Sequence, residues 1–126
     1  MNQILVALGS NEFPELHIEQ ATAELTGLFS SVKWSPAVYT EPIACSRPIP
    51  FLNRVAMAET LLGIEELHEQ FKLLEKKMGR LPTSKHTGII PIDIDLIRWN
   101  RVLLKPDDYL RSYVQDALHW LERTDE

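Results

Sequence analysis

Two aspartates separated by one residue, Asp93 and Asp95, lie within the apolar run 89–97. The flanking residues predict a strand that is buried on at least one face. Residues i and i+2 of a strand point to the same side, so the two carboxylates should lie close together and repel each other. A cation between them removes this conflict, and the spacing therefore indicates a site for Mg²⁺ shared with a phosphate chain. A solvated edge strand with its polar face outward has the same spacing.

Basic residues concentrate just before this strand. Between residues 72 and 86, five cations stand against the single acid Glu75, in a chain whose formal net charge is −5: Lys72, Lys76, Lys77, Arg80 and Lys85. Such a cluster can neutralise a polyphosphate whose metal ion the aspartates hold, and His86 is placed to touch a phosphate. Basic residues at a helix C-terminus also complement the helix dipole without any ligand, so both interpretations stay open.

A third group of residues suits a flat ring. Phe51 and Asn53 are two residues apart and face the same side of a predicted strand. An aromatic side chain can stack on a heterocycle, and an amide can both donate and accept hydrogen bonds at its edge. The segment Gly9-Ser10-Asn11 lies between a predicted strand and a predicted helix, where backbone amides can hold an anion. A tight turn explains that segment equally well.

Composition narrows the class of protein. The chain has 126 residues, 44% of them hydrophobic, which predicts one domain over residues 1–126. The net charge of −5 argues against nucleic acid or an anionic membrane as a partner. No apolar run approaches the length of a membrane span, and the N-terminus does not resemble a signal peptide. With the single Cys45, these features predict a cytoplasmic protein with small-molecule partners, and they leave the oligomeric state open.

The elements that position these side chains follow from hydrophobic periodicity. Strands are expected at residues 4–8, 32–40, 51–60 and 89–97, with a short one at 102–104. Helices are expected from Pro14 and over residues 64–78, the second closed by Gly79. Loops are predicted at residues 42–50, which contain three prolines, and at residues 80–88. The order β-α-β-β-α-β predicts a ferredoxin-like α+β sandwich with an antiparallel sheet.

A last helix is expected to follow the short strand. Pro106 and the two acids after it are typical of a helix N-terminus. Apolar residues then recur at helical spacing and predict a buried stripe: Leu110, Val114, Leu118 and Leu121.

Taken in order along the chain, these pieces resemble one family. The resemblance covers about residues 3 to 100 and rests on an ordered set of motifs: Leu8-Gly9-Ser10-Asn11, Tyr39-Thr40-Glu41-Pro42-Ile43, Phe51-Leu52-Asn53, Glu75 with Gly79-Arg80, and Asp93-Ile94-Asp95. The set resembles 6-hydroxymethyl-7,8-dihydropterin pyrophosphokinase, a family of the folate pathway. The resemblance implies pyrophosphoryl transfer from ATP to the hydroxymethyl oxygen of the reduced pterin, with release of AMP.

The resemblance also implies a role for individual residues. It implies that Asp93 and Asp95 hold two Mg²⁺ ions that bridge the ATP phosphates. Substrate contacts are implied for Thr40, Pro42, Ile43, Phe51 and Asn53 on the pterin, and for Glu75 and Leu96 near the nucleotide. Arg80 matches a basic residue that faces phosphate. With Lys85 and His86, it is expected to offset the charge that develops during transfer.

The chain departs from the family in two places. Ile90 stands where the family's motif has an arginine. The downstream P-H-[PY] motif, and the following segment with an arginine and a second aromatic, have no recognisable counterpart. Lys105 and Arg111 are candidates to replace the lost positive charge. The sequence therefore leaves open a slow enzyme, a non-catalytic pterin- or nucleotide-binding relative, and an oligomerisation module.

Overall fold

The computed structural model describes residues 1–41 and 49–123. Pro42, Ile43 and Cys45 lie outside the described residues, so their predicted roles have no structural counterpart here. No helix in the described ranges has the length and apolarity needed to cross a bilayer.

The strands form an antiparallel sheet in the order β2-β4-β1-β5-β6, in which β3 also pairs with β4. This topology confirms the predicted α+β, ferredoxin-like fold. The elements, in chain order, are β1 (Asn2–Ser10), α1 (Pro14–Leu28), β2 (Ser31–Trp34), β3 (Val38–Thr40), β4 (Phe51–Thr60), α2 (Ile64–Lys77), α3 (Ser84–Thr87), β5 (Asp93–Trp99), β6 (Val102–Leu103), α4 (Pro106–Tyr109) and α5 (Ser112–Arg123).

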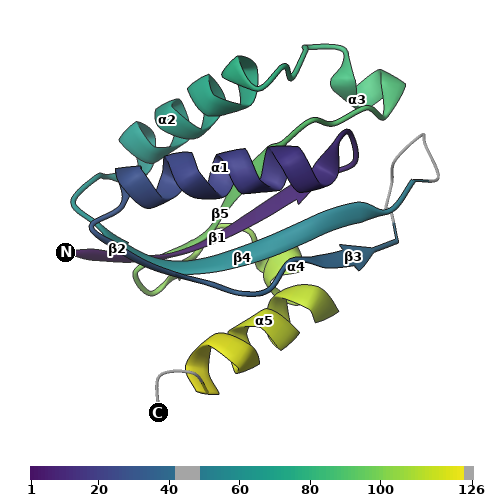
Figure 1. Cartoon of the computed structure of the whole chain (residues 1–126). Coiled ribbons are helices and arrows are strands. Elements are labelled where there is room, and N and C mark those ends of the chain that lie inside the picture. Colours follow the sequence, from purple (N-terminus) through teal and green to yellow (C-terminus); the bar gives the residue numbers. More distant parts are fainter. Residues whose placement is uncertain (42–48, 124–126) are drawn as a thin grey trace.

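Helices cover both faces of the sheet. Figure 1 shows α1 and α2 over one face and α5 against the other. The central strand β1 serves both layers, because Val6 packs in the core that holds Phe71 of α2, whereas Leu5 packs in the core that holds Leu118 of α5. Burial on both sides explains why β1 is a continuous apolar run instead of an alternating one.

The second predicted strand is interrupted. Residues 32–40 form two short strands, β2 and β3, because Pro36 has no N–H for the ladder. Ser35 bridges the gap: its backbone N–H donates to the Val55 carbonyl at 2.8 Å, and its Oγ accepts from the Val55 N–H at 3.0 Å. The interruption leaves both short strands paired to β4.

Three further features differ from the prediction. The aspartate strand begins at Asp93, after Pro91, and residues 84–87 of the expected loop form the short helix α3. The last helix is broken at Leu110 and Arg111, so α4 and α5 are separate helices. The break explains why Leu110 is 72% exposed instead of buried, while the helical stripe continues as predicted in α5: Val114, Leu118 and Leu121.

Candidate active site

The sheet register assembles the site. Gly9 of β1 pairs with Asn53 of β4 on one side and with Asp93 of β5 on the other. Two residues earlier, Ala7 pairs in the same way with Val55 and Asp95. Side chains at i and i+2 share a face, so the amide and both carboxylates project from one surface. The small residues Gly9 and Ala7 form the floor between them.

A cavity of about 500 Å³ lies over this floor, a volume typical of small-molecule sites. Its walls come from β1, β4, β5, the α2–α3 region and the C-terminal segment. Apart from the floor, the wall is strongly charged: Lys72, Arg80, Lys85, Lys105 and Arg111 are basic, and Glu41, Glu75, Asp93, Asp95 and Asp108 are acidic. Phe51 and Tyr113 add aromatic surface. Such a cavity suits a ligand that combines a ring with charged phosphates.

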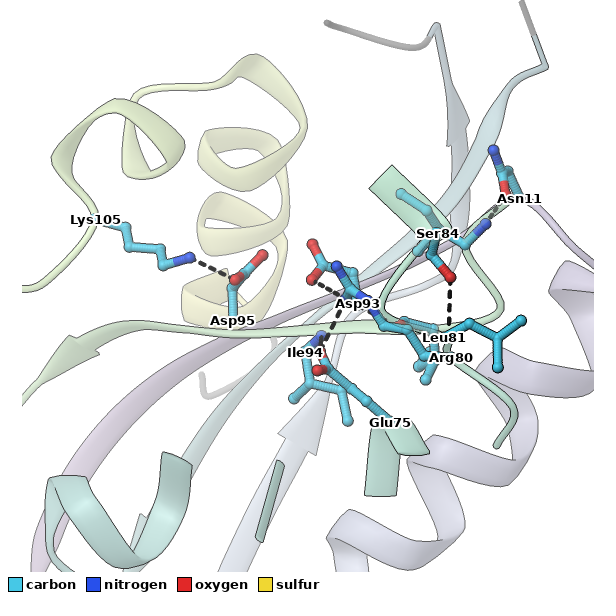
Figure 2. Close-up of polar contacts among 11 residues, drawn as sticks. Asn11, Glu75, Arg80, Leu81, Ser84, Asp93, Ile94, Asp95 and Lys105 are labelled. Atoms are coloured by element: carbon cyan, nitrogen blue, oxygen red, sulfur yellow. Dashed lines mark hydrogen bonds and ion pairs between the residues drawn. The ribbon is translucent and has the colours of Figure 1, made fainter. Parts of the chain in front are cut away.

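Each aspartate of the central pair contacts its own basic side chain. Arg80 Nη1 lies 2.7 Å from Asp93 Oδ1, and Lys105 Nζ lies 2.6 Å from Asp95 Oδ1. Figure 2 shows the two carboxylates side by side on β5, with their cations approaching from opposite sides. Two cations thus already balance much of the charge repulsion between the acids.

The environment shifts the pKa values of Asp93 and Asp95 in opposite directions. Burial, then the charge of Asp93, raises the pKa of Asp95 to about 7. Burial alone would also raise the pKa of Asp93, but hydrogen bonds with Asp95 and Arg80 outweigh it and lower that pKa. The metal-free pair therefore shares a proton near neutral pH.

Among the described residues no group of three or more His, Cys, Asp or Glu side chains could hold a metal ion. A bound ion would take these two carboxylates and find its other ligands in water and phosphate, the arrangement Mg²⁺ commonly adopts.

This proton sharing predicts how stability depends on pH. The ordinary pKa of Asp95 is 3.8, so between about pH 4 and pH 7 the unfolded chain ionises while the folded chain keeps the proton. Asp95 therefore lowers stability progressively as the pH rises through this window. We expect Asp95→Asn to raise the free energy of unfolding of the metal-free protein by on the order of 2 kcal/mol at pH 8 and by almost nothing at pH 4. Urea titrations at several pH values measure this difference.

The matched control is Asp107→Asn, which removes an exposed carboxylate on α4. Its effect on stability should be small at every pH. The opposite shift of Asp93 acts only below about pH 4, because the folded-state pKa of Asp93 is lowered. A stability gain for Asp95→Asn that is the same at pH 4 and pH 8 would contradict the shared proton.

Glu75 and Arg80 fix the position of the aspartate strand. Glu75 is 7% exposed, and its Oε2 accepts hydrogen bonds from the Ile94 N–H at 2.8 Å and from Arg80 Nη1 at 3.1 Å. Burial raises the pKa of Glu75. Gly79 ends α2 in a left-handed conformation with a φ of 101°, as its predicted cap position requires, and the chain then turns Arg80 toward Asp93. Glu75 lies on the cavity wall, but its visible role is to hold Arg80 and the strand.

Asn53 forms the other end of the site. It is 4% exposed, and its Nδ2 donates to Thr40 Oγ1 and, at 3.1 Å, to the Phe51 carbonyl. These bonds turn Oδ1 toward the space over Gly9, where an added Cβ would lie 3.4 Å from it. Thr40 therefore orients Asn53 and lines a neighbouring groove instead of the charged cavity.

Asn11, the last residue of the motif Leu8-Gly9-Ser10-Asn11, has a structural role. Its Oδ1 accepts from the Ile90 N–H at 2.7 Å, and its Nδ2 donates to the Gly88 carbonyl at 2.6 Å. The side chain thereby holds the segment that precedes the aspartate strand, 77 to 79 residues further along the chain. This segment presents Ile90 to the cavity, at the position where an arginine was expected.

The structure brings together most of the site residues that the sequence singled out. The cavity wall includes Phe51, Asn53, Glu75, Arg80, Lys85, Asp93 and Asp95. Three predicted residues of the described ranges lie elsewhere: Thr40 in the neighbouring groove, as described above, and also Leu96 and His86. Leu96 is buried in the core beneath α1 and α2, because it alternates with the aspartates along β5. His86 is exposed on α3 and is not part of the cavity wall.

Sequence reasoning missed one residue of the C-terminal segment, Tyr113. Although that segment lacks the expected motif, it supplies both an arginine and an aromatic ring to the cavity, Arg111 and Tyr113. The Arg111 guanidinium lies 4.7 Å from the centre of the Tyr113 ring. Arg111 and Lys105 were both named as possible replacements for the lost charge, and Lys105 contacts Asp95 directly. The available signal was a group of basic and aromatic residues after the strand, but its placement depends on the break between α4 and α5.

Known proteins resemble this chain in sequence. The family model described as 7,8-dihydro-6-hydroxymethylpterin-pyrophosphokinase (HPPK) matches residues 5–123. The mitochondrial folate synthesis bifunctional protein of Pisum sativum is 29% identical over 113 residues, which cover 83% of this chain and 21% of the relative. The folate synthesis bifunctional protein of Chlamydia trachomatis serovar D is 34% identical over 103 residues, 76% of this chain and 23% of the relative. The chain thus spans about a fifth of the length of these relatives.

Proposed function

The chain belongs to the 7,8-dihydro-6-hydroxymethylpterin-pyrophosphokinase family, and on this basis we propose that it transfers a pyrophosphoryl group from ATP to 6-hydroxymethyl-7,8-dihydropterin in folate biosynthesis. The hydroxymethyl oxygen attacks the β-phosphorus and loses its proton to solvent, the bond between that phosphorus and the α-phosphate oxygen breaks, and AMP leaves with the electron pair of that bond. The observation that carries the proposal is a cavity that has the aspartate pair on one wall and the Asn53 amide on another. We propose that residues 1–126 form one domain for this reaction.

The donor set fits a hard divalent ion. Asp93 and Asp95 offer carboxylate oxygens on one face of β5, and carboxylate with phosphate oxygen is the ligand type that Mg²⁺ prefers. When bound, Mg²⁺ neutralises charge on the phosphates. The resemblance implies two ions, and the number that this chain binds depends on Lys105, which already contacts Asp95.

Basic side chains would hold the phosphates in place. Arg80 and Lys85 approach from the α2–α3 side, and Arg111 comes from the C-terminal segment. Phosphoryl transfer depends mainly on positioning and on neutralising charge in the transition state. These side chains would supply the positive charge that Ile90 does not. His86 is not assigned a role, because it lies away from the cavity wall.

The pterin would occupy the other end of the cavity. Phe51 and Tyr113 both line it and offer aromatic faces for a flat ring, while Asn53 offers its Oδ1 to the ring edge. Gly9 leaves open the space in front of this oxygen. Pro42 and Ile43 remain predicted pterin contacts.

Removing the Asn53 amide should weaken pterin binding more than ATP binding. A hydrogen bond from a buried polar group contributes about 1–3 kcal/mol when its loss leaves the partner unpaired. We therefore expect Asn53→Ala to raise the KM for the pterin by roughly 5- to 150-fold, with little change in the KM for ATP. Thr40→Val is the control, because it removes an orienting partner of Asn53 and should have a smaller effect in the same direction. Equal increases in both KM values would argue against a pterin site at Asn53.

A direct assay tests the proposed reaction. Protein, Mg²⁺, ATP and 6-hydroxymethyl-7,8-dihydropterin should yield AMP and the pterin diphosphate in equal amounts. Omitting the pterin should stop AMP formation. No AMP at any protein concentration would overturn the proposal.

The alternative is a relative that binds the ligands without catalysis. One observation favours it: Ile90 lines the cavity where the family's motif has an arginine. Calorimetry with an ATP analogue and with the pterin, alongside the AMP assay, separates the two, since a non-catalytic relative would bind both and release no AMP. In either case we propose a cytoplasmic protein with small-molecule ligands and no nucleic-acid partner, which the net charge of −5 supports.

A further inference from the structure

Lys105 is built into the site by its backbone. It follows β6, and its N–H and that of Leu104 both donate to the Ile97 carbonyl, at 3.2 and 2.8 Å. Ile97 lies on β5, two residues after Asp95. The position of Lys105 is therefore set by the same strand that carries the aspartates, and its Nζ reaches Asp95 Oδ1 at 2.6 Å.

The aspartate pair has limited room for further cations. One oxygen of Asp93 is bound to Arg80, and one oxygen of Asp95 is bound to Lys105. Figure 2 shows the two carboxylates side by side, with the two basic side chains on either side of them. One oxygen of each acid is left, which together suit a single bridging ion. A second ion on Asp95 would have to displace Lys105.

We propose that Lys105 takes the place of one of the two divalent ions, so that this chain binds ATP with a single Mg²⁺. The inference rests on the proposed function and deepens it. An ammonium group has three donors and no acceptor, so it can bind Asp95 and still donate to phosphate oxygens. The pair of basic partners is asymmetric, because Arg80 is also held by Glu75 and the Ile92 carbonyl, whereas Lys105 presents its ammonium with 44% of its side chain exposed.

Counting bound metal tests this inference without using turnover. Mn²⁺ is added to the protein in the presence of the non-reacting α,β-methylene analogue of ATP, and the free Mn²⁺ is counted by electron paramagnetic resonance. We expect one Mn²⁺ per chain for the natural protein and two for Lys105→Met, which keeps the side-chain length but removes the charge. Lys105→Arg keeps the positive charge and should therefore bind one ion. A second ion that appears only in Lys105→Met is then due to the lost charge and not to a disturbed fold. Lys77→Met, on the exposed ion pair with Glu24, is the matched control and should also bind one.

Two results would overturn the inference. Two Mn²⁺ ions on the natural protein would show that a metal ion displaces Lys105 from Asp95. One ion on both the natural protein and Lys105→Met would show that something other than Lys105 limits the count. Failure of the proposed function is a different result: a chain that releases no AMP in the direct assay can still bind the analogue with one Mn²⁺, whereas the inference about Lys105 is judged by the metal count alone.

Discussion

Asp95→Asn should abolish metal-dependent nucleotide binding and lower turnover by roughly 10³-fold or more, the scale of effect seen when a group that neutralises phosphate charge is lost. The amide has nearly the shape of the carboxylate, so the fold should be preserved. It lacks the negative charge that a divalent ion requires. The measurements are calorimetry with an ATP analogue, with and without Mg²⁺, and release of AMP.

The same substitution should make the metal-free protein more stable at neutral pH, because it removes a partly buried carboxylate whose pKa is raised by burial and by the charge of Asp93. Loss of function together with a gain in stability identifies a residue whose charge serves a ligand instead of the fold. Asp107→Asn should leave both nucleotide binding and stability close to those of the natural protein. Unchanged Mg²⁺-dependent binding in Asp95→Asn would contradict the metal site and favour an edge strand with harmless acids.

Arg80→Ala should have the largest effect on folding. The substitution leaves the buried carboxylate of Glu75 without its cation and also removes bonds to Asp93 and to the Ile92 carbonyl. Removing one partner of a buried ion pair costs about 3–5 kcal/mol, a large part of the roughly 5–15 kcal/mol that stabilises a typical domain. Urea unfolding at pH 7 measures the loss. Lys77→Ala breaks an exposed pair with Glu24 and should cost less than about 1 kcal/mol.

A double substitution separates the structural role of Arg80 from its proposed catalytic role. Arg80→Ala combined with Glu75→Gln removes the unpaired charge, because the neutral amide needs no cation beside it, so much of the stability should return. Turnover should not return, since Arg80 then no longer offers its positive charge to the phosphates. A double variant as unstable as Arg80→Ala would show that Arg80 stabilises the fold through its other contacts.

The local pattern of the chain was a good guide to its elements. The alternating and continuous apolar runs predicted the strands, and the bounds of β4 were predicted correctly at both ends. Gly79 ended α2 as its type and position required. These features depend on neighbouring residues, whose preferences are visible in the sequence. The break at Pro36 followed from a local property, the missing N–H of proline, which the prediction of one continuous strand did not use. The break at Leu110 depended on how the chain packs against other strands and helices.

The positions of the side chains were predicted correctly where spacing along one strand was enough. The i, i+2 rule placed Asp93 and Asp95 on one face, and Phe51 and Asn53 on the cavity wall. It also shows why the Leu96 side chain lies in the core instead of on the cavity wall, because a residue next to Asp95 on the strand must face the opposite side. The role of Glu75 as a support for Ile94 could not be inferred, since the two residues meet only when α2 packs against β5.

By itself, the sequence determined the elements, the paired acids and the class of ligand that they suit. The tertiary structure decided which side chains meet. Register placed Gly9 between Asn53 and Asp93, and the turn after β6 placed Lys105 on Asp95. The break after α4 brought Tyr113 to the cavity. Local preferences fix the periodicity of a segment, whereas contacts between distant segments follow from how the apolar faces pack together, and no short stretch of sequence encodes that packing.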